Sequence, residues 1–333
     1  MPLLFAVTSL LCRCGPAVLA LLCFAGAAAQ ADEQPLIRAA VLKYGTVSWE
    51  LQTLQAQRFD QQQGFSLQLV PLASMMATQT ALKSGAVEVI VADWLWVARQ
   101  RAAGDKLQFM PFSASVGKVV VAADSPIQQL QQLRGRRIGV AGGPLSKGWL
   151  LLQAVALQRG IDLKQESSLQ FGAPPLLNAA LEQGQLDAVV TFWHYAARLE
   201  ARGWRALVDL DQLGRELGLS TDLPLLGYVF AESWAREHPQ RVAALQRAVR
   251  LARDYLNRQE AGWQALRPQM RAEDEAVYRR LQAGYRSGTP AVLTAAHLRD
   301  AERLFQVLAE IGGAPLVGSA TRLDPQLFWR GGD

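Results

Sequence analysis

Short apolar segments alternate with helical patterns along much of the chain, and this alternation limits the folds that are open to it. Strand-like segments cover residues 36–44, 65–72, 87–91, 107–112 and 118–123, and helical patterns cover 49–63, 74–84 and the residues up to 103. Alternation of this kind is typical of βαβ units, in which helices cover both faces of a mostly parallel sheet. The first part of the chain therefore belongs to the α/β class.

The same rhythm restarts after residues 124–126. Strand-like segments follow at 136–140, 168–171, 188–191 and 206–208, and one more comes after Pro224 at 226–231. The rest is almost entirely helical, with strong periodicity at 239–257, 272–285 and 294–311. We expect two lobes, with the chain crossing between them near 116–125 and 223–229. Lobe one takes residues 32–120 and 226–333, including a helical C-terminal tail, and lobe two takes 121–225.

The N-terminus has the pattern of a secretory signal peptide over residues 1–31. Arg13 precedes a short apolar core at 16–24, and Ala29-Gln30-Ala31 forms a small-x-small cleavage site. An uncleaved membrane anchor is the alternative, because apolar residues also precede Arg13. Cleavage predicts a periplasmic, secreted chain.

Charge distribution and cysteine content exclude several classes of function. The formal net charge is +5 and the basic residues are dispersed, whereas nucleic-acid-binding proteins concentrate them in a patch. The three cysteines, Cys12, Cys14 and Cys23, all lie in the predicted signal peptide, and we do not expect Cys23 to carry a lipid because Leu22 precedes it. We expect no nucleic acid, no metal, no cofactor and a monomeric chain.

A turn at residues 142–148 joins a strand pattern to a helical pattern. Gly142 and Gly143 allow a bound group to approach the backbone, and Ser146 and Lys147 open the helix, where free N–H groups and the helix dipole attract anions. A plain strand–helix connection, with Ser146 as the N-cap, is the alternative. The turn is a candidate site for an anionic or polar group.

Other strand ends carry aromatic residues, hydroxyls and a few charges. Ligands of open parallel sheets bind beyond the carboxyl ends of the strands. The candidates at these ends are Tyr44, Thr46, Trp49, Asp93, Trp94, Thr191, Trp193, His194 and Tyr228. Core packing is the alternative for Trp94 and for one of the neighbours Phe192 and Trp193, and a capping or surface role is the alternative for His194. Together they indicate a small-molecule cleft with apolar walls and a few polar groups.

Common enzyme signatures are missing from the sequence. Ser146-Lys147 does not complete a phosphate-binding P-loop, and there is no Gly-x-Ser-x-Gly elbow. The three histidines are far apart and do not form a zinc motif. We therefore expect a binding protein rather than an enzyme.

Several stretches of the chain resemble the periplasmic solute-binding proteins of ABC importers. They are 81–89 (ALKSGAVEV), 130–140 ending in LRGRRIGV, the glycine turn after it, 181–189 (LEQGQLDAV) and 234–240. Their order and spacing are most similar to the nitrate/sulfonate/taurine branch, which also includes proteins for thiamine-pyrimidine precursors.

This resemblance implies a type II periplasmic-binding-protein fold, whose two lobes close on a small-molecule ligand and deliver it to a permease and ATPase complex. By position, the candidate residues named above would line the cleft. Glu50 and Asp93 lie near the expected anion site, so an organic anion and a polar aromatic solute both remain open. An enzyme of pyrimidine or thiamine precursor metabolism on the same fold, and a ligand sensor without a transport role, also remain open.

Overall fold

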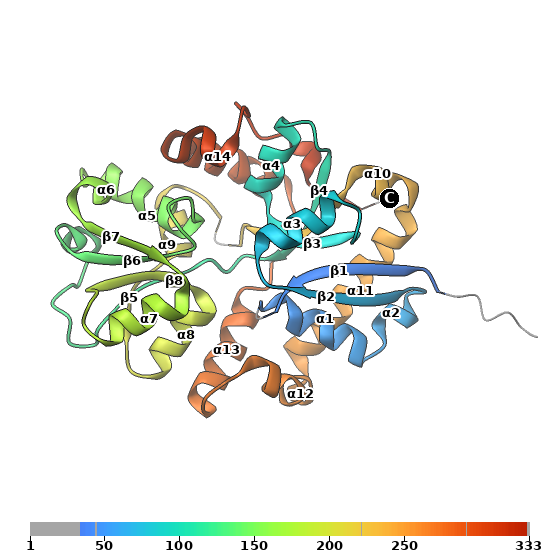
Figure 1. The fold of residues 1–333 in the computed structure, drawn as a ribbon, viewed down its shortest axis with the longest axis horizontal. Helices are drawn as coiled ribbons and strands as arrows, with labels where there is room; N and C mark the ends of the chain where they lie inside the picture. The colour runs from blue at the N-terminus through green and yellow to red at the C-terminus, as the bar shows by residue number, and fades with distance from the viewer. Residues whose placement is uncertain (1–33, 44, 221, 291, 332–333) are drawn as a thin grey trace, which may run out of the picture. The chain divides into compact units, whose positions relative to one another are not determined.

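The protein contains two five-stranded sheets built to the same plan (Figure 1). In a computed structural model of the chain, residues 34–43, 45–220, 222–290 and 292–331 are described. The predicted signal peptide and Tyr44 lie outside these residues. The predicted α/β class is confirmed, with mostly parallel sheets and a helical C-terminal region.

The first sheet has the order β2-β1-β3-β10-β4. Strands β1, β2 and β3 pair in parallel, and β10 is inserted antiparallel between β3 and β4. The bounds of the strands are β1 (Leu36–Leu42), β2 (Ser66–Leu72), β3 (Val89–Asp93), β4 (Leu107–Ser113) and β10 (Leu226–Ala231).

The second sheet repeats this pattern in the order β7-β6-β8-β5-β9. Strands β6, β7 and β8 are parallel, and β5 is the antiparallel insert between β8 and β9. The bounds are β5 (Gly117–Val121), β6 (Arg137–Ala141), β7 (Ser168–Gly172), β8 (Ala188–Phe192) and β9 (Arg205–Asp209). Each sheet thus receives its inserted strand from a segment that has just crossed from the other.

The position of β5 corrects the expected boundary between the lobes. The sequence places residues 118–123 with the first series of strands, but β5 hydrogen-bonds only within the second sheet. The run of valines predicts a buried strand without indicating which sheet it joins. The two crossings are therefore the segments 114–116 and 217–225.

Helices cover both faces of each sheet. The helices of the first α/β series are α1 (Val47–Ala56), α2 (Phe59–Gln62), α3 (Met75–Lys83) and α4 (Trp94–Ala102). The second series has α5 (Lys147–Gln158), α6 (Leu163–Glu166), α7 (Pro174–Glu182), α8 (Trp193–Ala201) and α9 (Leu210–Glu216), with a 3₁₀ turn at Leu130–Leu133. The pattern at 49–63 predicts one helix, but Arg58 has a φ of 55° and separates α1 from α2.

The C-terminal helices belong to the first sheet, although two of them, α13 and α14, also contact helices of the second sheet. They are α10 (Glu232–Glu237), α11 (Pro239–Arg258), α12 (Glu260–Met270), α13 (Glu275–Ser287) and α14 (Ala295–Val317), followed by a 3₁₀ turn at Pro325–Leu327. Helices α1, α11, α12 and α13 share one apolar core with a face of the first sheet. Helix α14 packs on both α4 and α5, so a second core runs continuously from the first sheet to the second.

No helix within the described ranges is long and apolar enough to cross a membrane.

The inserted strand β10 requires a glycine at position 227. A Cβ atom at Gly227 would lie 2.5 Å from the carbonyl oxygen of Met110 and 2.4 Å from the ring of Phe109. Real Cβ contacts are not this short, so a side chain here would push β10 away from β4.

We therefore expect Gly227→Ala to lower the free energy of unfolding by about 1–3 kcal/mol, the usual range for overpacking a filled site. Urea unfolding measures this change. Gly172→Ala is the control, because its Cβ would meet Leu177 at an ordinary 3.5 Å. Equal effects of the two substitutions would contradict the packing argument.

Candidate functional site

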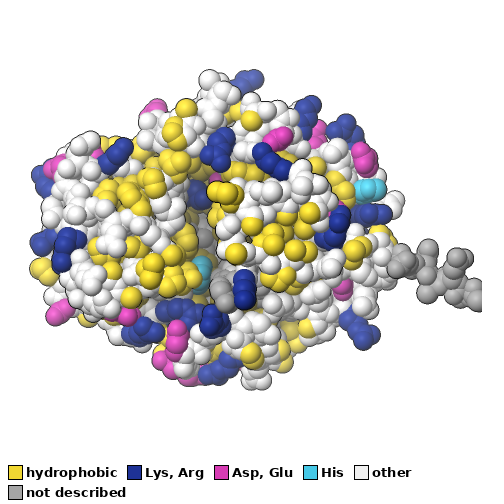
Figure 2. Space-filling view, viewed as in Figure 1, with side chains coloured by type: hydrophobic (Ala, Val, Ile, Leu, Met, Phe, Trp, Pro, Cys, Tyr) yellow, Lys and Arg dark blue, Asp and Glu magenta, His cyan; other side chains and the backbone are white. Residues whose placement is uncertain are grey.

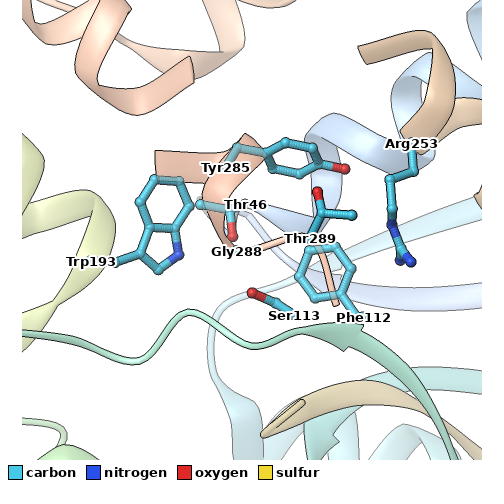
Figure 3. Close-up of a pocket in the computed structure, with 8 residues that line it drawn as sticks. All are labelled: Thr46, Phe112, Ser113, Trp193, Arg253, Tyr285, Gly288 and Thr289. Carbon is cyan, nitrogen blue, oxygen red and sulfur yellow. The ribbon is translucent and has the colours of Figure 1, made fainter. Parts of the chain in front are cut away.

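A small cavity lies where elements of both sheets meet (Figure 3). Thr46 comes from the turn after β1 in the first sheet, and Trp193 is the first residue of α8, directly after β8 in the second. The cavity has a volume of about 10 Å³, which is room for about one water molecule. Its lining residues are Thr46, Phe112, Ser113, Trp193, Arg253, Tyr285, Gly288 and Thr289.

Three hydroxyl groups face this cavity. Thr46 precedes α1 and its side chain makes no capping hydrogen bond. Ser113 lies at the end of β4, where its Oγ accepts a hydrogen bond from the amide of Ser115 at 3.2 Å. The Oγ1 atom of Thr289 is buried without a hydrogen-bond partner among the described residues. Thr46 and Thr289 therefore offer hydrogen-bonding capacity that a solute could use.

A buried charged network supports one end of the cavity. Glu50 in α1 is completely buried and accepts hydrogen bonds from the hydroxyls of Tyr228 and Tyr285, both at 2.6 Å. The guanidinium of Arg253 in α11 donates to the same carboxylate at 3.0 and 3.2 Å. Burial, followed by the charge of Glu50, raises the pKa of both tyrosines well above 10, so both remain hydroxyl donors.

The opposite end of the cavity is aromatic, as Figure 3 shows with Trp193 facing the Arg253 end. The Trp193 ring meets Trp49 edge to face, with centroids 6.1 Å apart. Trp49 also contacts Trp263 at 6.1 Å and Tyr285 at 6.3 Å. Trp49 is itself 5% exposed, so it supports the wall from behind.

The glycine turn is joined to the first sheet by an ion pair. Gly142 and Gly143 have φ angles of 83° and 92°, which favour glycine, and Ser146 caps α5 by accepting from the amide of Trp149 at 3.4 Å. The Lys147 Nζ donates to Asp93 Oδ2 at 2.8 Å. Two of the predicted sites, from different sheets, are thus brought into contact.

Asp93 is ionised in this pair. Burial alone raises the pKa of its carboxyl, but the charge of Lys147 and hydrogen bonds from Lys147 and the Trp96 amide lower it below the usual value. The other carboxylate oxygen of Asp93 caps α4 through Trp96 at 2.8 Å. The positive charge of Lys147 is therefore already paired with a buried carboxylate.

Thr191 and His194 lie beside this region at the end of β8. Thr191 is 2% exposed and its Oγ1 has no hydrogen-bond partner within the described structure. The His194 ring packs on Phe192 and Tyr195, and its Nδ1 is also unpartnered among the described residues. Burial, with a smaller contribution from Arg198, lowers the pKa of His194 to about 3, so the ring is neutral at ordinary pH.

Two residues predicted to line the cleft lie in the interior, and the sequence left packing open as an alternative only for Trp94. Trp94 is fully buried, and its indole N–H donates to the carbonyl of Pro224 at 3.1 Å. Tyr228 is 1% exposed and its hydroxyl is used by Glu50. Neither has free surface for a solute in this conformation.

Most of the cavity wall is not predicted from the sequence. Arg253, Tyr285 and Thr289 come from α11, α13 and the residue pair after it, and the sequence of these helices looks generic. One signal could have found Arg253, because it lies four residues after Val249 and three before Leu256 on the buried face of α11. A charged residue within an apolar stripe requires a buried partner, here Glu50.

Figure 2 shows a groove on one face of the molecule, with apolar side chains gathered on both sides of it. Exposed apolar residues occur beside the carboxyl ends of both sheets, among them Met76 at 76% in α3 and Leu176 at 70% in α7. No group of three or more His, Cys, Asp or Glu side chains in the described ranges is arranged to hold a metal ion.

The network around Glu50 gives a direct test of its role. Glu50→Gln leaves the buried Arg253 guanidinium without its carboxylate, and we expect the free energy of unfolding to fall by about 3–5 kcal/mol. Urea unfolding is the measurement. Tyr285→Phe, which removes one of several donors to Glu50, is expected to cost less than half as much. A Glu50→Gln protein as stable as the wild type would show that the network does not support the fold.

The pKa of His194 predicts a pH dependence. In the unfolded chain a histidine binds a proton near pH 6.5, whereas folded His194 does so only near pH 3, so acid favours the unfolded state between these values. On lowering the pH from 7 to 4, wild-type stability should fall relative to His194→Asn by up to about 3 kcal/mol. Urea unfolding across this range, with Tyr195→Phe as a control that removes no imidazole, tests it. A difference that does not change with pH would contradict burial of the neutral ring.

Comparisons with known proteins show where this fold occurs. The chain is similar to the alkanesulfonate-binding protein SsuA of Xanthomonas axonopodis pv. citri, bound to MOPS, with 20% identity, 90% of this chain and 99% of that chain covered, and a TM-score of 0.68. The chain is also similar to the periplasmic aliphatic sulphonate binding protein SsuA of Escherichia coli. The identity is 18%, the match covers 90% of this chain and 94% of that chain, and the TM-score is 0.71. The two-lobed binding-protein fold expected from the sequence is thus confirmed.

The same fold also occurs in an enzyme. The desulfurization enzyme DSZB is similar with 17% identity, 84% of this chain and 93% of that chain covered, and a TM-score of 0.60. A search of curated protein sequences found no match.

The family described as NMT1/THI5 like has a sequence model that matches residues 53–260. This match spans more than half of the chain and includes segments of both sheets. The chain belongs to the NMT1/THI5-like family.

Proposed function

We propose that the protein is the periplasmic solute-binding component of an ABC importer. One observation carries this proposal: Thr46 from the first sheet and Trp193 from the second line a single cavity together with the Arg253 guanidinium. A site built from both sheets is complete only when they are held together. Binding there would couple solute capture to the arrangement of the two lobes, which a permease could then recognise.

The cavity wall suits a small organic anion or a polar aromatic solute. Arg253 and the hydroxyls of Thr46 and Thr289 supply donors, and Trp193, Phe112 and Tyr285 supply apolar surface. The two SsuA proteins of the same fold bind sulfonates, which combine an anionic head with an organic body. Glu50 already compensates the charge of Arg253, so hydroxyls and aromatic contacts share the recognition with charge.

We assign the two lobes from the two sheets. Lobe one is the first sheet with the C-terminal helices, and lobe two is the second sheet, with the boundaries moved to the crossing segments 114–116 and 217–225. The cavity of about 10 Å³ is too small for a sulfonate in the present arrangement. Solute therefore binds while the lobes are apart, and closure then completes the wall.

We propose binding without catalysis. The cavity wall presents hydroxyls, one guanidinium and aromatic rings, but no cysteine and no histidine beside a hydroxyl to activate it. The similarity to DSZB extends to the fold alone. Secretion through the predicted signal peptide would place the chain in the periplasm, as a monomer delivering its solute to a permease and ATPase complex.

A thermal-shift screen tests the proposal with nitrate, methanesulfonate, taurine, MOPS, acetate and 4-aminopyrimidine as probes. A solute that binds the folded state raises stability by about 2.7 kcal/mol at one hundred times its Kd. Calorimetry on the best probe then gives the affinity. No shift with any probe, or turnover of a probe by the protein, would contradict the proposal.

Variants locate the site once a probe binds. Thr46→Val removes one hydroxyl and keeps the shape, and we expect it to weaken binding about fivefold to tenfold, as for one lost hydrogen bond. Thr80→Val on the exposed side of α3 is the matched control. A wild-type affinity for Thr46→Val would exclude this cavity as the site.

The glycine turn is tested separately. If Lys147 leaves Asp93 to contact an anionic probe, Lys147→Met should weaken binding of that probe. The double variant Lys147→Met/Asp93→Asn is the control for the Asp93 carboxylate that Lys147→Met leaves unpaired. Unchanged affinity in the double variant would show that the turn does not contact the solute. The Thr46→Val result stands independently of this outcome.

A further inference from the structure

Helix α13 contains a glycine that its backbone does not require. Gly284 lies near the end of a regular 13-residue helix, and its φ is not in the left-handed region. Glycine inside a helix costs about 1 kcal/mol relative to alanine, so its presence calls for a packing reason.

That reason is the side chain of Trp193. A Cβ atom on Gly284 would lie 2.7 Å from both Cε3 and Cζ3 of the Trp193 ring. Trp193 starts α8 on the second sheet, whereas α13 shares the core of the first sheet. The missing side chain of Gly284 thus makes a notch in one lobe that receives a ring from the other.

The last turn of α8 is hydrogen-bonded to the segment that joins α12 to α13. The Arg198 guanidinium donates to the carbonyls of Arg271 at 2.9 Å and Met270 at 2.7 Å, and it pairs with Glu273 at 2.6 Å. These acceptors lie at the end of α12 and just before α13. Trp193 and Arg198 therefore dock α8 at both ends.

The crossing segment meets α13 at the next turn. The carbonyl of Gly288 accepts a hydrogen bond from the amide of Ala114 at 3.0 Å, and a Cβ on Gly288 would lie 2.0 Å from Ser115 Oγ. Residues 114–116 connect β4 to β5, so Gly284 and Gly288 receive the ring of the second lobe and the segment that leads to it.

We propose that Gly284 is a positioning residue that seats Trp193 and thereby fixes the closed arrangement of the two lobes. Gly284 does not line the cavity, but the ring that it seats forms one wall. The notch acts through Trp193, because the Trp193 ring lines the cavity together with Thr46, Arg253 and Tyr285. The inference rests on the proposed function for its link to solute binding, whereas the seating of the ring is a property of the chain alone.

Small-angle X-ray scattering on the full chain tests the seating without any solute. Gly284→Ala fills the notch, so α8 moves off α13 and the radius of gyration should rise. Gly214→Ala in α9 is the matched control, because its Cβ would meet Leu219 only at 4.0 Å. The radius of gyration of this control should equal that of the wild type, and both variants should keep the wild-type far-ultraviolet circular dichroism.

A double-mutant cycle separates seating from a merely structural role of Gly284. Trp193→Leu removes the ring atoms that would clash, so adding Gly284→Ala to Trp193→Leu should change the radius of gyration no further. Equal changes on the wild-type and Trp193→Leu backgrounds would overturn the proposal, as would a Gly284→Ala protein with wild-type scattering.

Calorimetry with the best probe of the solute screen links the seat to binding. We expect Gly284→Ala to lower the affinity for that probe about tenfold if the population of the closed arrangement falls to about one tenth. If no probe binds the wild type, the proposed function fails, while the scattering cycle still decides the role of Gly284. If probes bind and Gly284→Ala leaves both affinity and scattering unchanged, the positioning role of Gly284 is contradicted while the proposed function stands.

Discussion

The buried carboxylate of Glu50 is the interaction on which the candidate site depends. It draws together α1, β10, α11 and α13 through Tyr228, Arg253 and Tyr285, and these elements are far apart in sequence. A carboxylate without such partners would be costly to bury, so the four elements must reach it in one arrangement. The same arrangement presents Arg253 and Tyr285 to the cavity. Stability of the first lobe and the shape of the site are therefore set by one network.

The topology explains why the opposite wall comes from the second lobe. Both sheets have four strands of one direction and an antiparallel insert in the fourth position, and the insert arrives directly from the other sheet. The crossing into β5 therefore arrives beside the end of β8, where α8 begins, and the crossing into β10 arrives beside the end of β3, where α4 begins. Trp193 follows β8 beside the first of these crossings, and at the cavity it meets Thr46, which follows β1. The seat at Gly284 lies next to this hinge region, which lets a single missing side chain influence the closure of whole lobes.

The fold could be predicted from the sequence because it depends on local patterns. Alternating apolar and helical segments specify strands and helices, and their order specifies parallel sheets. The sheet to which β5 belongs could not be predicted, since a run of valines is compatible with either partner. The cavity wall was predictable where it follows strand ends, as for Thr46 and Trp193, whereas the sequence did not indicate that Lys147 and Asp93 pair with each other. Arg253, Tyr285 and Gly284 lie on amphipathic helices, whose pattern gives the buried face but not the element that packs there.

Charge alone does not explain what this cleft would select. Lys147 is paired with Asp93, Arg253 is paired with Glu50, and the His194 ring is neutral at ordinary pH. An anionic solute would gain less from cations whose charge is already compensated, so hydroxyls and apolar contacts must offset part of its desolvation. The remaining donors are the hydroxyls of Thr46 and Thr289, which favour partial negative charge without demanding a full one. Phe112 and Tyr285 offer apolar contact from the first lobe, and Trp193 adds its own only when its ring packs against Gly284. Selectivity in the proposed binding site is then governed by how well a solute satisfies the hydroxyls and lets the ring return to Gly284, which makes its shape as decisive as its charge.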